Sequence, residues 1–289
     1  MSFILTTDTS CDEFKSELDK NNIPWLPLTF MIDGEVFEDD FRADEKYEEF
    51  FKKLEGGAMP TTSQITPMAY EEFFDEVFKN NAGDTIIHLS LSGGLSGTAS
   101  NAKKAADDYM VKHPDKKIFA VDTLLATQAH NFLMQEVIKM RDSGMDAQEA
   151  FEKIEKLKTK TYAIFMVSDL HHLKRGGRVS AVEAVVGTIL KIKPVLMIDG
   201  EGKLVVIKKT PGVNKALDFF MSEIERLKDE DSGFFIVHGN AKETAEKLRQ
   251  KISEKYPKSG ILFGWLGPVI GAHTGNGLVG LGFFGKDKK

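Results

Sequence analysis

The alternation of short apolar strands with amphipathic helices is the feature that most constrains the fold of this chain. In the first half, β-branched runs at residues 3–7, 86–91 and 118–121 are each followed by a helical pattern. That order is typical of βα units, because parallel strands need a long crossover connection. We therefore expect an N-terminal α/β domain over residues 1–160, with a mainly parallel sheet flanked by helices.

Local signals mark further elements in this half. Asp33-Gly34 predicts a tight type I′ hairpin, since both positions of that turn need positive φ. Ser10 with Glu13 has the spacing of a capping box that opens a helix. Pro67 occupies the first position of another helical pattern, where its missing N–H does no harm.

The second half of the chain has a different order of expected strands and helices. A Gly-rich turn at residues 199–202 separates strand patterns at 194–198 and 204–208, which predicts an antiparallel hairpin. A helix is expected over residues 180–190, and further helices and strands follow the hairpin. These patterns predict a C-terminal α/β domain over residues 161–289 with a mixed sheet, and a ligand cleft between the two domains.

Composition limits the location of the protein. Cys11 is the single cysteine among 289 residues, which excludes an internal disulfide framework and favours a reducing, cytoplasmic setting. Residues 1–9 lack the basic start and apolar run of a secretory signal. Residues 259–285 are apolar but are broken by glycines and Pro268, so no integral membrane association is expected.

Charge is unevenly distributed. The net charge of −6 disfavours a nucleic-acid partner. Residues 171–217 nevertheless hold nine Lys or Arg against three acidic residues. Two interpretations stand: one face that meets an anion or an acidic partner, or solvated lysines on scattered loops.

The usual cofactor and metal motifs do not fit. Residues 275–280 match G-x-G-x-x-G, but neither the helix nor the later acidic residue that a dinucleotide site requires can follow before Lys289. The sequence contains no P-loop and no H-E-x-x-H motif, and His171 and His172 are adjacent. We therefore expect neither a cofactor nor a metal.

Hydroxyl side chains gather where strands are expected to lead into helices. Thr62 and Ser63 precede the Pro67 helix, and residues 90–98 join a buried strand to the next helix. At the carboxyl edge of a parallel sheet, such side chains and helix N–H groups suit a small anion such as a carboxylate or phosphate. The alternative is that these hydroxyls only cap their own helices.

Two further segments carry candidate residues. His273 lies in a stretch interpreted as a glycine-rich bend, from which an imidazole would donate to an anion across the cleft or only bond locally. Lys174, Arg175 and Arg178 surround Gly176-Gly177. That basic turn would hold a phosphate, dock an acidic partner or simply be exposed.

Taken together, these segments resemble the DegV family of bacterial fatty-acid-binding proteins. The resemblance runs in order along nearly the whole chain. It is carried by the residues at 7–12, 62–64, 95–98, 173–180, 190–194 and 271–275.

The resemblance implies a two-domain α/β protein that holds one long-chain fatty acid between its domains. On the matching positions, Thr62, Ser96 and His273 would bind the carboxylate. The loaded protein would be a carrier, not a catalyst, and would present the carboxyl group to a separate ATP-dependent fatty acid kinase for acyl-phosphate formation in phospholipid synthesis. Secondary contacts to the carboxylate are expected from Ser63, Ser92 and Gly94.

Three positions depart from the family pattern. Gly93 replaces a common serine, and Asn276 replaces a common proline. Pro211 stands where an arginine associated with the kinase partnership is often found. The residues left for docking the kinase are Arg175, Arg178, Lys208 and Lys209. The preferred acyl chain and the oligomeric state are not fixed by the sequence.

Two other functions are alternatives to the carrier. A serine-dependent acyl hydrolase or transferase would use Ser96 with His273, and it would need a base within reach of the serine and an acidic residue to orient that base. A DNA-associated regulator would use the basic segment, but no helix-turn-helix signal supports it.

Overall fold

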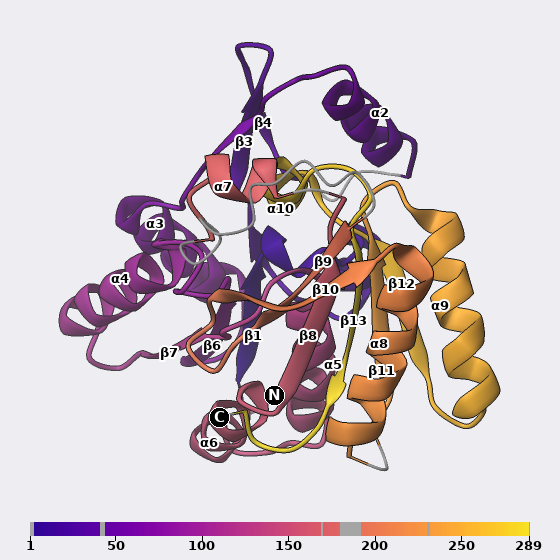
Figure 1. The fold of residues 1–289 in the computed structure, drawn as a ribbon. Coiled ribbons are helices and arrows are strands. Elements are labelled where there is room, and N and C mark those ends of the chain that lie inside the picture. The colour runs from indigo at the N-terminus through magenta and orange to yellow at the C-terminus, as the bar shows by residue number, and fades with distance from the viewer. Residues whose placement is uncertain (1–2, 41–43, 169, 180–191, 230–231, 289) are drawn as a thin grey trace.

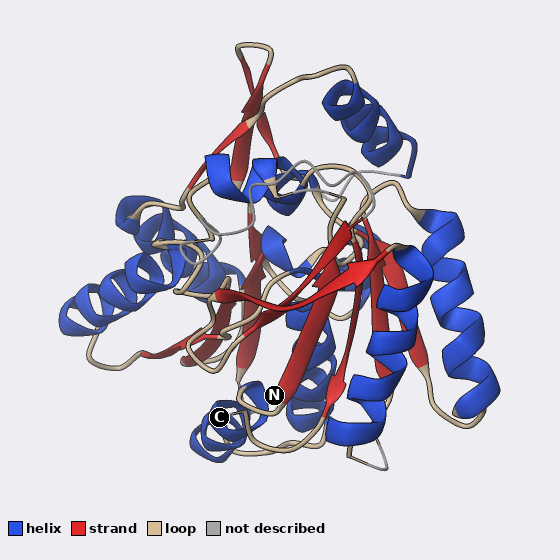
Figure 2. Cartoon of the chain, viewed as in Figure 1, coloured by secondary structure: helices blue, strands red, loops and turns tan. Residues whose placement is uncertain are grey.

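The computed structural model describes residues 3–40, 44–168, 170–179, 192–229 and 232–288 (Figure 1). The helix expected over residues 180–190 lies outside the described residues. The described strands form three sheets, with helices packed between and around them (Figure 2). The predicted α/β fold class is confirmed.

The first half begins with short strands and continues as βα units. Its elements are, in order, β1 (Ile4–Asp8), the 3-10 turn η1 (Thr9–Cys11), α1 (Lys15–Lys20), β2 (Trp25–Leu26), β3 (Thr29–Ile32), β4 (Glu35–Glu38), α2 (Asp44–Glu55), β5 (Thr61–Ser63), α3 (Pro67–Asn80), β6 (Thr85–Ser90), α4 (Thr98–Lys112), β7 (Lys117–Asp122), α5 (Thr127–Asp142) and α6 (Ala147–Lys158).

The second half contributes the larger sheet. Its elements are, in order, β8 (Thr161–Met166), α7 (His171–Arg175), β9 (Ile192–Ile198), β10 (Leu204–Pro211), α8 (Val213–Leu227), β11 (Phe234–His238), α9 (Lys242–Lys255), β12 (Ile261–Trp265), α10 (Pro268–Thr274) and β13 (Val279–Phe284).

The first sheet is parallel, with the strand order β2-β1-β6-β7. Its central strands β1 and β6 are buried along almost their whole length, including polar side chains such as Thr6, Thr7 and His88. The second sheet has the order β10-β9-β8-β13-β11-β12 and is mixed, because only β11 and β12 run parallel. Helix α5 contacts β1 on one side and β8, β11 and β12 on the other, so it lies between the two sheets.

A small antiparallel sheet of β4, β3 and β5 projects above the first sheet (Figure 1). Its hairpin turns at Asp33 (φ 55°) and Gly34 (φ 84°), as the Asp-Gly signal predicts. The expectation for Thr62 was wrong in one respect. It lies on β5, paired with Phe30 of β3 in the small antiparallel sheet, and not in a loop that joins a strand of the parallel sheet to a helix.

The capping box predicted at Ser10 is also wrong. Helix α1 begins at Lys15 after Phe14, which makes no side-chain cap. Ser10 instead belongs to η1, where its N–H donates to Asp8 Oδ1 over 2.9 Å. Asp8 Oδ2 accepts a bond from the Leu91 N–H, also over 2.9 Å. Burial raises the pKa of Asp8 to about 6, although these hydrogen bonds oppose the shift.

The hydrophobic core is continuous across the middle of the chain. One cluster of buried side chains includes Leu5 and Phe51 from the first half and Phe165 and Phe235 from the second. A second cluster fills the space between the larger sheet and α8 and α9. The domain division at residue 160, in the turn between α6 and β8, stays a prediction. No helix in the described part of the chain is long and apolar enough to cross a membrane.

The two halves meet closely where residues 91–97 pack on the hairpin turn at residues 199–202. Ser92 Oγ donates to the Gly202 carbonyl over 2.8 Å and accepts from the Gly94 N–H over 3.2 Å. A Cβ on Gly94 would lie only 2.5 Å from the Gly202 carbonyl oxygen. Residue 94 must therefore be glycine for the two backbones to approach this closely.

We expect Gly94→Ala to lower the free energy of unfolding by about 1–3 kcal/mol, because the added methyl group meets backbone that cannot move without strain. Urea titration followed by circular dichroism measures the change. Gly260→Ala is the matched control, since a Cβ there has no atom within 4 Å. Equal midpoints for the two variants would contradict the close packing described.

Candidate functional site

A cavity of about 450 Å³ lies between the parallel sheet and the mixed sheet. Its wall is mostly apolar and draws on both halves of the chain. The first half contributes Leu28, Leu91, Leu95 and Ala126, and the second contributes Phe165, Ile198, Leu204, Phe235, Leu266 and Leu278 among others. Such a volume is within the range of pockets that enclose a small organic ligand.

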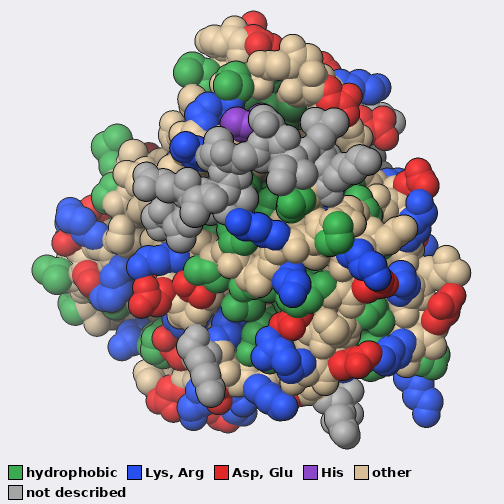
Figure 3. Space-filling view, viewed as in Figure 1, with side chains coloured by type: hydrophobic (Ala, Val, Ile, Leu, Met, Phe, Trp, Pro, Cys, Tyr) green, Lys and Arg blue, Asp and Glu red, His purple; other side chains and the backbone are tan. Residues whose placement is uncertain are grey.

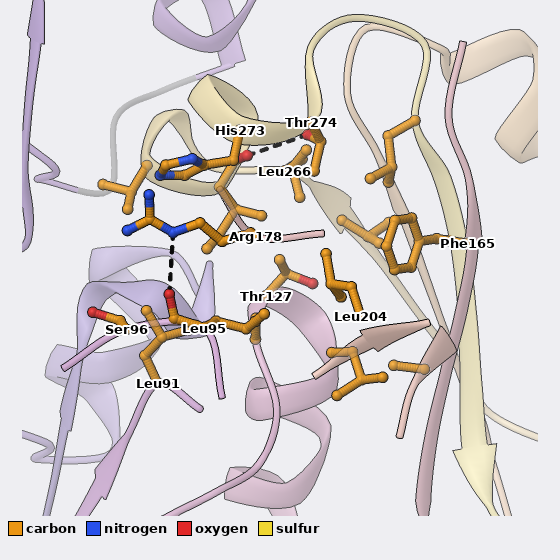
Figure 4. A pocket seen from close by; sticks show the side chains of 18 of the residues that line it. Leu91, Leu95, Ser96, Thr127, Phe165, Arg178, Leu204, Leu266, His273 and Thr274 are labelled. Atoms are coloured by element: carbon orange, nitrogen blue, oxygen red, sulfur yellow. Dashed lines mark hydrogen bonds between the residues drawn. The ribbon is translucent and has the colours of Figure 1, made fainter. Parts of the chain in front are cut away.

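Three predicted residues from distant parts of the sequence line this one cavity: Thr62, Ser96 and His273. Thr62 comes from β5, Ser96 from the loop before α4, and His273 from α10. Thr62 Oγ1 and His273 Nε2 are 2.8 Å apart, within hydrogen-bonding distance. The fold therefore gathers a hydroxyl–imidazole pair and a second hydroxyl in a mainly apolar cavity. Figure 4 shows Ser96 and His273 in its wall.

Ser96 also has a local role. Its Oγ lies 2.9 Å from Thr98 Oγ1 and accepts a bond from the Thr98 N–H over 3.3 Å. The capping interpretation and the cavity interpretation of this serine are thus both compatible with its position. A serine hydroxyl with one donor and two acceptor positions has capacity left for a ligand.

The interpretation of the segment around His273 as a bend was wrong. His273 lies in the last turn of α10, which begins at Pro268. A Cβ on Gly176 would lie 2.4 Å from His273 Nδ1, so only glycine at that position lets the imidazole approach α7. Burial, and secondarily the positive charges of Arg178 and Arg175, lower the pKa of His273 to about 4. The imidazole is therefore neutral at pH 7.

The two arginines of the basic turn lie in different environments. Arg178 lines the cavity, and its Nε donates to the Leu95 carbonyl over 3.2 Å (Figure 4). Arg175 is exposed, with its guanidinium near Met59 and His172. Sequence reasoning grouped both with partner docking. It missed the place of Arg178 in the cavity wall, because no local pattern shows which way a side chain in this turn points.

Of the other predicted residues, one lines the cavity and the rest do not. Ser63 lines the cavity, whereas Ser92 and Gly94 hold the hairpin turn at residues 199–202 and are not among the residues that line the cavity. Lys208 and Lys209 are exposed on β10, an edge strand of the mixed sheet, where Lys208 Nζ lies 5.9 Å from the centre of the Phe219 ring.

The structure also accounts for two departures from the family pattern. A Cβ on Gly93 would lie 2.5 Å from Asp122 Oδ2, and the Gly93 N–H donates to Asp122 Oδ1 over 3.0 Å. The Asp122 carboxylate thus occupies the space that a serine side chain would need. Asn276 donates from Nδ2 to the Phe51 carbonyl over 2.9 Å, a bond that proline cannot make.

No cluster of three or more His, Cys, Asp or Glu side chains that could hold a metal ion occurs in the described part of the chain. The G-x-G-x-x-G match at residues 275–280 leads into the strand β13 and not into a helix. A dinucleotide pyrophosphate would therefore find no helix N-terminus there.

The lowered pKa of His273 can be measured by NMR. We expect its ring signals to titrate near pH 4, and its pKa to rise in Arg178→Gln, because removal of the nearby positive charge makes the imidazolium less unfavourable. The signals are assigned by their loss in His273→Gln. Lys208→Gln, which removes a charge that does not influence His273, should leave the pKa unchanged. Titration of the wild-type ring near 6.5 would contradict this description.

The fold and site together define a class of α/β proteins that enclose an apolar cavity with hydroxyls and an imidazole in its wall. Comparison with known proteins gives the family. Residues 2–286 match the model of a family described as "Uncharacterised protein, DegV family". A DegV domain-containing protein of Clostridium perfringens is 35% identical over 289 residues, covering 99% of both chains. The chain belongs to the DegV family, as the resemblance in the sequence implied.

Solved structures agree with this assignment. A DegV family protein from Thermus thermophilus, described by its fatty acid binding, has a TM-score of 0.87 at 27% identity and covers 99% of this chain and 100% of its own. DegV from Bacillus subtilis, described as a fatty acid binding protein, has a TM-score of 0.85 at 26% identity, with the same coverage. A DegV lipid binding protein from Thermotoga maritima has a TM-score of 0.86 at 27% identity over the full length of both chains.

Proposed function

We propose that this protein binds one long-chain fatty acid in the cavity between its sheets, with the carboxylate at Thr62, Ser96 and His273. The observation that carries the proposal is the convergence of these three polar side chains in the wall of an otherwise largely apolar cavity. The fatty acid binding described for the relatives from Thermus thermophilus and Bacillus subtilis supports it.

The energetics of the cavity suit an amphipathic ligand. Each methylene group removed from water contributes about 0.8 kcal/mol, so a long acyl chain supplies most of the affinity. The carboxylate loses its hydration and needs donors in return. A neutral His273 can donate from Nε2 to Thr62 Oγ1, which leaves the Thr62 O–H to donate to the carboxylate. Arg178 adds a positive charge in the same wall.

We expect organic extraction of the purified protein, followed by mass spectrometry, to yield a long-chain fatty acid. After removal of lipid, the protein should take up added acid, measured by calorimetry. Absence of acid from the extract together with no uptake of added acid would overturn the proposal.

The hydroxyl contacts predict the effect of two substitutions. Thr62→Val and Ser96→Ala should each weaken fatty acid binding about tenfold or more, because each removes a hydrogen bond to a charged group. Ser100→Ala is the matched control. Ser100 is exposed on α4, donates to the Gly97 carbonyl and is not itself among the residues that line the cavity. Equal affinities for Ser96→Ala and Ser100→Ala would exclude Ser96 from the carboxylate site.

We further propose that the loaded protein presents the carboxyl group to a separate ATP-dependent fatty acid kinase. With such a partner, the protein would act in the cytoplasm. A carboxylate held largely by neutral donors keeps its lone pairs available to a phosphoryl group. The exposed Lys208 and Lys209, close in sequence to Pro211 on the edge strand β10, are the residues proposed to meet that partner.

Acyl-phosphate formation with such a kinase tests this step. Lys208→Glu with Lys209→Glu should reduce the rate because the surface charge reverses, whereas Pro211→Arg should increase it. Lys247→Glu, an exposed lysine on α9, serves as the control. A rate insensitive to residues 208, 209 and 211 would place the partner elsewhere.

The hydrolase alternative receives less support from the geometry. A serine nucleophile needs a base within hydrogen-bonding distance. The hydrogen bonds of the described residues join His273 to Thr62, and Ser96 to Thr98. Ester hydrolysis that disappears in Ser96→Ala would favour the enzyme over the carrier.

A further inference from the structure

The N-terminus of α5 is buried beside the cavity without a cap. Ala126 and Thr127, at the start of this 16-residue helix, line the cavity, and Gln128 and Ala129 follow them into the core. No side chain caps the helix, and the backbone N–H groups of residues 127–129 make no hydrogen bond to any residue that the structure describes. A buried helix end of this kind requires a polar group from elsewhere.

The Thr127 side chain adds a second, independent observation. It is 8% exposed and lines the cavity, yet its hydroxyl has no hydrogen-bond partner within the described ranges (Figure 4). Thr274, in the same cavity wall, shows the usual solution, because its Oγ1 donates to the Ile270 carbonyl over 3.2 Å. A largely buried side chain whose hydroxyl opens onto the cavity without a partner among the described residues is placed to meet a polar atom of a ligand.

Thr127 is separate from the proposed carboxylate site. Thr127 comes from α5 and His273 from α10, and Figure 4 labels the two apart from each other in the cavity wall. Of the described cavity-lining residues, only Arg178 and His273 have side chains that can carry positive charge. In the proposed function Arg178 already balances the carboxylate of the bound acid, so a second anion would lack a counter-charge. A neutral oxygen could instead accept from the N–H groups and exchange a hydrogen bond with the hydroxyl.

We propose that Thr127 and the N-terminus of α5 form a second polar subsite that receives a neutral oxygen, a hydroxyl or keto group, carried on the acyl chain. This inference rests on the proposed fatty acid binding and narrows it to a ligand class. The cavity then accepts oxygenated long-chain acids, because the oxygen buried with the chain recovers hydrogen bonds that an unsubstituted chain leaves unmade.

Binding of stearic acid and of its hydroxy and keto derivatives, with the oxygen placed at several points along the chain, tests the subsite by calorimetry. The quantity compared is the ratio of the affinity for a derivative to the affinity for stearic acid. For at least one derivative, Thr127→Val should lower this ratio about 3- to 10-fold. Thr127→Ser, which keeps the hydroxyl, should retain the wild-type ratio. Thr274→Val, which removes a cavity hydroxyl already satisfied by its own helix, should also leave the ratio unchanged.

Binding of stearic acid itself shows that each variant is folded. If Thr127→Val does not bind stearic acid, Thr127→Ala is used in its place. An unchanged ratio for every derivative would overturn the subsite and would mean that the helix end holds only water. Failure of the wild-type protein to bind stearic acid would instead overturn the proposed function. The two failures are therefore distinguishable.

Discussion

The cavity depends on the close contact between residues 91–97 and the hairpin turn at 199–202. The Ser92 hydroxyl bonds the Gly202 carbonyl, and Gly94 approaches the same turn too closely for any side chain. The buried Asp8 carboxylate holds the start of the loop by accepting a hydrogen bond from the Leu91 N–H. This contact holds the loop that carries Leu95 and Ser96 against the second half of the chain, so the cavity walls keep their spacing without side chains having to fill the space between them.

The polar part of the cavity combines a neutral imidazole with a nearby guanidinium. Burial and the charge of Arg178 keep His273 unprotonated, so Arg178 is the charged group among the described residues of the cavity wall. A carboxylate in this position would be balanced by one positive charge and by hydroxyl donors, without a tight ion pair to His273. Because a carboxylate raises the pKa of a neighbouring imidazole, binding of an acid favours proton uptake by His273. The affinity for the acid is expected to rise as the pH falls towards the pKa of the occupied site.

Much of the fold could be predicted because the signals are local. The βα alternation predicted the parallel sheet, and Asp33-Gly34 predicted the hairpin of β3 and β4. The errors arise where tertiary contacts decide. Gly271 suggested a bend, but a Cβ there would lie 2.9 Å from the Phe50 ring, so this glycine permits close packing of a helix. β5 is three residues long and too short to show a strand pattern. The orientation of Arg178 depends on Leu95, which is distant in sequence.

Nothing in the sequence marks Thr127 as a candidate residue, although it lines the cavity. The rule that ligands collect at the carboxyl edge of a parallel sheet applies to the loop after β7 as well as to the loop after β6. No sequence motif marks the former. Its character comes from a backbone in which Leu124 (φ 58°) and Thr127 (φ 57°) are both left-handed, an unfavourable conformation for side chains of these types. A fold retains such a conformation where the surrounding structure determines it, and here it places the start of α5 against the cavity. If the proposed function holds, the acyl chain would pass a surface that is not uniformly apolar, and selectivity among acids would arise at the start of α5 as well as at the carboxyl group.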